Sequence, residues 1–197
     1  MGLSVLFSKF VYQIHSLGHQ CNSQPAHLLK PTAIQENFLQ LLNENQGIVR
    51  KVCHLYGRNP SDKDDLYQEI VIQLWKSFTS FRGESKFSTW MYRIALNTAI
   101  SDIRKQNRTV ELSFPELLPR EEADTADTAK EEQLKQMYTA IQKLSEVEKA
   151  IVMLYLEDKS YDEMEEILGI SNGNLRVKMN RIKDKLRTMT KEEAYGT

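Results

Sequence analysis

The sequence contains few of the residues that mark secreted, membrane or disulfide-rich proteins. Among 197 residues there are only two cysteines, Cys21 and Cys53, and they have no CxxC spacing. This pattern indicates free thiols in a reducing compartment. The amino terminus lacks the basic segment of a secretory signal, and its short apolar stretch is interrupted by Ser8 and Lys9. Because no other apolar stretch could span a membrane, we expect a cytoplasmic protein that does not insert into the bilayer.

Recognisable catalytic and metal-binding motifs are also missing. The sequence has no GxGxxG, Walker, HExxH or GxSxG motif. Three histidines and one cysteine fall within the first thirty residues, namely His15, His19, Cys21 and His27. No second, well-spaced half of a metal site accompanies them, so we interpret their proximity as coincidence. We therefore expect no enzymatic activity, no cofactor and no metal ion.

The alternating pattern of β-strands is absent, whereas apolar residues recur at steps of three and four residues. The sequence therefore predicts an all-α protein, with helices near residues 33–56, 62–79, 88–106, 131–143, 146–156, 161–168 and 172–189. Four helix starts are marked by a Ser or Thr followed three residues later by an acid or Gln. The pairs are Thr32 with Gln35, Ser61 with Asp64, Ser145 with Glu148 and Ser160 with Glu163.

The middle of the chain has the composition of a linker. Helical periodicity is lost after residue 107, two prolines follow at Pro115 and Pro119, and residues 116–132 contain seven acids and two bases. We therefore expect two small helical domains joined by a flexible acidic linker. The expected division is a weakly ordered extension over residues 1–30, a first domain over 31–107, the linker over 108–130 and a second domain over 131–190.

The second domain has the pattern of a helix-turn-helix. Its first helix carries apolar residues on one side, Gly169 allows the turn, and Ser171 is placed to cap the next helix. That next helix has an apolar face, and residues 171–191 contain seven bases and one acid. Because the major groove of DNA accepts such a helix, we expect duplex DNA contacts. The candidate residues are Ser171, Asn172, Asn174, Arg176, Lys178 and Arg181.

A charged, solvated helical hairpin is the alternative interpretation of this segment. We favour DNA binding because the capped first helix, the glycine turn and the separated faces occur together. One residue departs from the usual pattern. Glu165 stands where helix-turn-helix units usually have a small side chain, so it must extend outward or the two helices must splay slightly.

The first domain gathers aromatic side chains, with six of the 17 aromatic residues of the chain between residues 75 and 92. Most of these rings are expected in the core. However, a polar loop around Gly83 and a basic helix end accompany them, which is typical of proteins that bind single strands through rings, pockets and cations. The candidates are Arg82, Lys86, Tyr92, Asn97, Arg104 and Lys105. Asp65, Gln68 and Glu69 form a polar patch that is either solvated surface or a protein contact.

The segments DDLYQEIVIQLWKSF, FSTWMYRIALNTAISDIRK and LSEVEKAIVMLYLEDKSYDEMEEILGIS occur in this order around an acidic linker. Together they closely resemble the extracytoplasmic-function (ECF) group of bacterial sigma-70 family factors, over about residues 33–189. The resemblance implies that residues 33–107 correspond to sigma region 2 and residues 131–189 to region 4. It also implies a dissociable subunit that brings core RNA polymerase to a promoter, melts the DNA and allows transcription to start.

The resemblance further assigns partners to the candidate residues. The helix over residues 64–75 would dock on the clamp helices of the polymerase β′ subunit, through Asp65, Leu66, Gln68 and Glu69. Residues 81–105 would open the minus-10 element and hold a flipped base, and residues 171–187 would read the minus-35 duplex. The β flap of polymerase and an anti-sigma factor are further partners that the family suggests. Leu96 and Val177 differ from the residues that many members carry, so promoter contacts there are not transferred.

A different class of function competes with this interpretation. A two-domain regulator could bind DNA without entering polymerase, but it would need a ligand-binding or dimerisation domain in its N-terminal half. This half instead offers a docking helix and an aromatic segment that resembles a melting element.

Overall fold

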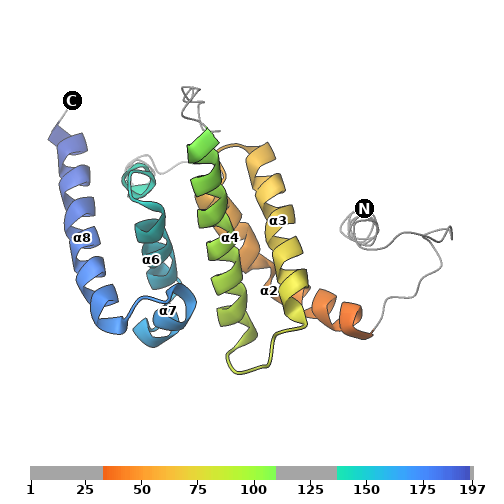
Figure 1. The fold of residues 1–197 in the computed structure, drawn as a ribbon. Coiled ribbons are helices and arrows are strands. Elements are labelled where there is room, and N and C mark those ends of the chain that lie inside the picture. The colour runs from red at the N-terminus through yellow and green to blue at the C-terminus, as the bar shows by residue number, and fades with distance from the viewer. Residues whose placement is uncertain (1–32, 110–136, 196–197) are drawn as a thin grey trace, which may run out of the picture. The chain divides into compact units, whose positions relative to one another are not determined.

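The computed structural model describes residues 33–109 and 137–195, and every regular element among them is a helix. The helices are α2 (Ala33–Tyr56), α3 (Pro60–Phe78), α4 (Phe87–Thr109), α6 (Glu146–Leu156), α7 (Tyr161–Leu168) and α8 (Asn172–Tyr195), with a shorter helical stretch over 137–142 (Figure 1). The all-α prediction is therefore confirmed for the described residues. The expected extension over 1–30 and most of the expected linker lie outside them, and the expected domain limits stay predictions.

The chain divides into the units Met1–Gln40 and Leu41–Thr197. Only the start of α2 represents the first unit among the described residues. The packing described below belongs to the second unit. None of the helices in the described part of the chain is both long enough and apolar enough to cross a membrane.

Helix starts follow from the side chains that satisfy backbone N–H groups in the first turn. The predicted capping boxes before α6 and α7 are confirmed: the Ser145 and Ser160 N–H groups each donate to a glutamate Oε2 three residues later, at 3.0 Å. The predicted start of α3 at Ser61 is wrong. Asn59 caps this helix by accepting the Asp62 N–H at 2.8 Å, because Pro60 fits the first helical position and moves the start earlier. Thr32 lies outside the described residues.

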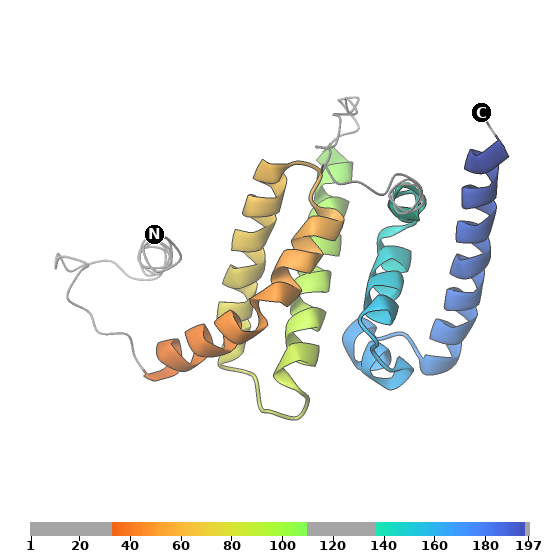
Figure 2. The same ribbon diagram turned by 180° about the vertical axis from the view of Figure 1, so that it is seen from behind.

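The α3 and α4 helices lie side by side, as Figures 1 and 2 both show. Ile70 and Leu74 of α3 are fully buried, as are Met91, Ala95 and Ala99 of α4. The two small alanines on α4 leave room for large aliphatic side chains, so the pair of helices forms a closely packed layer.

Cys53 of α2 is a buried free thiol. Burial raises its pKa to about 12, and the charge of Asp64 adds to this effect. The thiol is therefore protonated and inert at neutral pH. The predicted free thiol is confirmed at Cys53, whereas Cys21 lies outside the described residues.

Four aromatic rings gather where α3 ends and α4 begins. Phe78, Phe81, Phe87 and Trp90 form this aromatic cluster, with ring centroids 5.1 to 6.4 Å apart. Edge-to-face and tilted contacts at these distances are the favoured arrangements of aromatic pairs. The cluster anchors both ends of the connecting loop. Within that loop, Gly83 has a φ of 73°, which a side chain would disfavour.

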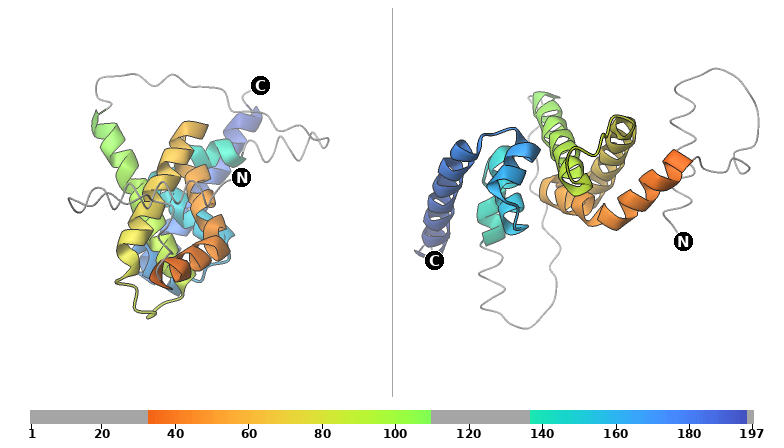
Figure 3. Two further views of the ribbon diagram at one scale, coloured as in Figure 1. Left: turned by 90° about the vertical axis from the view of Figure 1, so that its right-hand side faces the viewer. Right: turned by 90° about the horizontal axis from the view of Figure 1, so that it is seen from below.

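The α7 and α8 helices form the predicted helix-turn-helix, and Figures 1 and 3 follow the chain from one helix through the turn into the other. Gly169 ends α7 with a φ of 66°, and its N–H donates to the Glu165 carbonyl at 2.8 Å. Both helices contribute buried apolar side chains to the domain core, namely Met164, Ile167, Leu175, Met179 and Ile182. α8 continues past the predicted end at residue 189 to Tyr195.

Candidate nucleic-acid interface

The α8 helix separates a buried face from a basic one. Leu175, Met179 and Ile182 are at most 2% exposed. The candidate DNA-contacting residues lie outside this buried face, and five of them are exposed: Ser171, Asn174, Arg176, Lys178 and Arg181. The apolar face holds α8 against the domain while the cations stay in solvent, which is the arrangement that a helix needs to enter a DNA groove.

The first turn of α8 is tied to α7 by side chains that sequence reasoning did not connect. The Asn172 N–H donates to Glu165 Oε2 at 2.8 Å, and the Asn172 amide nitrogen donates to Asp162 Oδ1 at 2.6 Å. Arg176 Nε in turn donates to Asn172 Oδ1 at 2.8 Å, and its guanidinium carbon lies 4.7 Å from the centre of the Tyr161 ring. Glu165 is exposed, so the first of the two expected alternatives for this residue, outward extension, applies.

An ion pair between Lys185 of α8 and Glu148 of α6 joins these helices at 2.6 Å. Partial burial would raise the pKa of Glu148, but the hydrogen bond from Lys185 and those from Ser145 outweigh it and lower the pKa. The pKa of Glu163 is also lowered, first by the hydrogen bond from the Ser160 N–H. Among the described residues no group of three His, Cys, Asp or Glu side chains could hold a metal ion.

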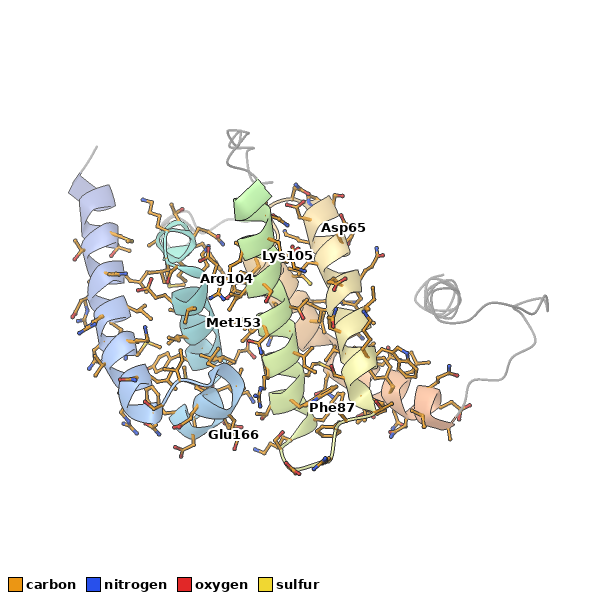
Figure 4. The ribbon with its side chains drawn as sticks, in the orientation of Figure 1. Asp65, Phe87, Arg104, Lys105, Met153 and Glu166 are labelled. Atoms are coloured by element: carbon orange, nitrogen blue, oxygen red, sulfur yellow. The ribbon has the colours of Figure 1, made fainter. Side chains whose placement is uncertain are left out.

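An open groove of about 710 Å³ runs between α3 and α4. We call it the interhelical groove. It brings together residues from two of the predicted sets, with Asp65 and Glu69 on α3, and Asn97 and Lys105 on α4. Figure 4 shows Asp65 and Lys105 on these two neighbouring helices, whereas Phe87 marks the opposite end, where α4 begins. The expected polymerase contacts and the expected melting contacts therefore share one surface.

Not every predicted residue on α3 faces the groove in the same way. Leu66 lines it but is only 6% exposed, so most of its surface packs against other helices. Gln68 is exposed and does not line the groove. Sequence reasoning missed the acids Asp62 and Asp102, which make the groove more acidic. These two acids line the groove only because of how α3 packs against α4, and no local sequence pattern predicts that packing.

The predicted melting residues divide by exposure. Arg82 and Lys86 are exposed on the α3–α4 loop, and Asn97, Arg104 and Lys105 are exposed on α4. Tyr92, in contrast, is only 2% exposed, and burial raises its pKa to about 12. The Tyr92 side chain is therefore inside the protein in this structure, while the cations lie on its surface. The roles assigned to all of these residues stay predictions.

The chain matches two families of known sequence. Residues 41–109 match Sigma-70 region 2, and residues 134–186 match Sigma-70, region 4. These two matches define a sigma-type transcription initiation factor. The chain is also 32% identical over 148 residues to the ECF RNA polymerase sigma-E factor of Escherichia coli strain K12, covering 68% of this chain and 78% of that protein. The chain belongs to the ECF group of the sigma-70 family of RNA polymerase sigma factors.

Solved structures show the same fold. The sigma factor RpoE of Bartonella quintana, solved with the anti-sigma factor NepR, has a TM-score of 0.66 at 22% identity, covering 79% of this chain and 98% of that chain. CnrH, solved with the cytosolic domain of CnrY, has a TM-score of 0.56 at 20% identity, covering 92% of this chain and 95% of that chain. The resemblance found from sequence motifs is thereby confirmed at the level of family and fold.

Proposed function

We propose that this sigma factor divides its work between two surfaces, with α8 reading the minus-35 duplex and the region around the interhelical groove serving polymerase docking and minus-10 melting. The observation that carries the proposal is the separation of faces on α8. Leu175, Met179 and Ile182 are buried, while Arg176, Lys178 and Arg181 are exposed on the same helix. Such cations neutralise phosphates and pair with guanine edges.

Polymerase docking is assigned to α3. The exposed acid Asp65 and the partly exposed acid Glu69 lie one helical turn apart on the same side of this helix and line the interhelical groove. Acids placed this way suit a basic helical partner such as the β′ clamp helices, because opposite charges across an interface favour association. The exposed Gln68 would extend this contact, and region 4 would contact the β flap.

Promoter melting is assigned to the α3–α4 loop and the exposed side of α4. The aromatic cluster fixes the loop ends, so that Arg82 and Lys86 are presented from a firmly anchored loop. Asn97 and Lys105 add polar groups along the interhelical groove. Capture of an unpaired base by such a surface offsets the cost of unstacking, which is a few kcal/mol for one base. No ATP is then required for melting.

Two further proposals concern partners and location. One of the two solved structures of similar fold contains an anti-sigma factor, NepR, which supports an anti-sigma factor as a partner of this chain as well. Because core polymerase and promoter DNA are its proposed partners, we place the protein in the cytoplasm. We assign it no chemistry of its own.

Reciprocal charge reversals test the division between the two surfaces. Arg176→Glu with Lys178→Glu should abolish binding to the minus-35 duplex and leave the affinity for core polymerase unchanged. Glu69→Lys should lower the affinity for core polymerase by about tenfold or more, because a like charge then faces a basic partner. Duplex binding by gel shift and polymerase binding by fluorescence anisotropy measure the two effects separately. Equal losses in both assays for either variant would refute the division.

The melting assignment is tested by Lys86→Ala combined with Asn97→Ala. Open complexes, detected by permanganate reactivity of unpaired thymines, should decrease by about tenfold, since a charged hydrogen bond is worth about 1.5–3 kcal/mol. Closed complexes should change less. Lys76→Ala is the matched control, because Lys76 is an exposed lysine on α3 that belongs neither to the α3–α4 loop nor to the groove. A greater loss of closed than of open complexes would refute the assignment.

A further inference from the structure

The start of α8 contains a network of four side chains from two helices, which we call the guanidinium network: Tyr161, Asp162, Asn172 and Arg176. Asp162 Oδ1 accepts a hydrogen bond from the Asn172 amide nitrogen at 2.6 Å, and Asn172 Oδ1 accepts one from Arg176 Nε at 2.8 Å. The Tyr161 ring lies under the guanidinium, 4.7 Å from ring centre to Cζ. The neutral Asn172 amide lies between the negative Asp162 and the positive Arg176, so both charges polarise it and each hydrogen bond strengthens the other.

This network fixes an exposed arginine before any DNA is present. A long, exposed side chain normally loses rotamer freedom when it binds, which weakens the contact that it makes. Arg176 is already held on two sides, by an amide oxygen along its edge and by an aromatic face beneath its plane. The amide contact uses Nε, and bidentate recognition of guanine O6 and N7 can use the two Nη groups.

The same network gives Asn172 a role other than reading a base. Bidentate recognition of adenine needs both the amide nitrogen and the amide oxygen of an asparagine. In this structure the Asn172 nitrogen is engaged by Asp162 and its oxygen by Arg176. Binding to adenine would therefore have to share both amide atoms with Asp162 and Arg176.

Glu165 explains why the network keeps its geometry. Its carboxylate accepts the Asn172 N–H at 2.8 Å, which links the first residue of α8 to the second half of α7. A small side chain at this position could not make that bond. Met164, between these two acids along α7, and Ile167, which follows them, are buried. The two acids are therefore carried by a helix whose opposite face is fixed in the core.

We propose that Tyr161, Asp162 and Asn172 are positioning residues that hold Arg176 to read one guanine of the upstream promoter duplex. This inference rests on the proposed binding of promoter DNA by α8, and it identifies Arg176 as the residue that contacts a base. Two of the candidate residues at the start of α8 therefore have different roles. Arg176 contacts the base, and Asn172 acts on DNA only through Arg176.

The test is a selection of DNA by the full chain assembled with core RNA polymerase, from duplexes randomised over the upstream promoter element. The wild type should enrich guanine at one position, and Arg176→Ala should lose this preference by about tenfold or more. Tyr161→Leu and Asn172→Ala should weaken the preference at the same position by about two- to fivefold. Tyr161→Phe keeps the aromatic ring and should therefore retain the wild-type guanine preference.

Three outcomes would contradict different parts of the proposal, and each can be told apart from the others. No base preference in the wild type would refute the reading of duplex DNA by α8 as a whole. A guanine preference that Arg176→Ala removes, but that survives in Tyr161→Leu and Asn172→Ala, would refute the positioning inference alone. A preference for adenine that only Asn172→Ala removes would show that Asn172 reads a base itself. Far-UV circular dichroism of each variant separates these results from misfolding.

Discussion

The basic face of α8 and the interhelical groove are two surfaces of one chain that form in different ways. The face of α8 lies on a single helix, where the helical period alone decides that Leu175 is buried and Arg176 is exposed. The groove needs two helices, since Glu69 and Asn97 line one surface only because α3 packs against α4. A surface on one helix can be derived from local sequence, whereas a surface between helices depends on tertiary packing.

This difference can be tested by removing a buried side chain from each region. Ile182→Ala in α8 and Leu74→Ala in α3 should each lower the free energy of unfolding by about 2–5 kcal/mol, because both side chains are fully buried and leave cavities. Urea denaturation followed by circular dichroism measures both. Trp75 and Trp90 are the two tryptophans of the chain, so tryptophan fluorescence reports on α3 and α4 in particular.

Val177→Ala is the matched control for the α8 variant. Val177 is 50% exposed on the same helix, so its replacement should change stability by less than about 0.5 kcal/mol. If Ile182→Ala lowered the free energy of unfolding as little as this control, the buried face of α8 would not be what holds the helix against the domain.

The sequence allowed most of the fold to be predicted, and the reasons are local. Capping boxes at Ser145 and Ser160 placed the starts of α6 and α7, and the positive φ of Gly169 agrees with the predicted turn. The start of α3 was misplaced because a serine-acid pair at Ser61 competed with the stronger combination of Asn59 and a proline at the first helical position.

The candidate site was less predictable wherever partners come from different elements. The hydrogen bond from the Asn172 N–H to Glu165 spans the turn between two helices, and no sequence pattern pairs these residues. The burial of Tyr92 is likewise a result of packing, because its neighbours along the helix do not distinguish it from a surface ring. Sequence periodicity therefore predicts which face of a helix is buried, but it does not predict which side chains of another helix that face contacts.

Substitutions at four glycines compare the two regions through smaller changes in the free energy of unfolding. Gly83 and Gly169 lie one in each region, at φ values of 73° and 66°, and an added Cβ would meet nothing within 4 Å at either position. Gly83→Ala and Gly169→Ala should therefore each cost about 1–2 kcal/mol through the backbone alone. Gly47→Ala and Gly173→Ala are the matched controls, because both glycines lie inside helices with open space around them.

Gly47→Ala should raise stability by about 0.5–1 kcal/mol, since alanine favours the helix interior over glycine, and Gly173→Ala, in the first turn of α8, should raise it by less. Thermal unfolding of all four variants under the same conditions gives the comparison. Equal effects at Gly83 and Gly169 would mean that loop and turn are held with similar rigidity. Stabilisation by Gly169→Ala would contradict the left-handed turn that joins α7 to α8.

The smallest expected effect comes from the ion pair between Glu148 and Lys185, which joins α6 to α8. The pKa of Glu148 is lowered in the folded protein from its ordinary value of 4.5, so the pair stabilises the fold above that pH and the contribution is lost as the pH falls through the lower folded value. Glu148→Gln and Lys185→Gln should each cost well under 1 kcal/mol at neutral pH, because Lys185 is half exposed.

In a double-mutant cycle the two changes should couple by about 0.2–1 kcal/mol at neutral pH, and the coupling should disappear in acid and weaken with added salt. Urea denaturation at several pH values measures it. A coupling that persists below the folded pKa would show that hydrogen bonding without charge joins the helices. A coupling of zero at neutral pH would mean that the packed residues of α8, rather than this ion pair, set its position against α6.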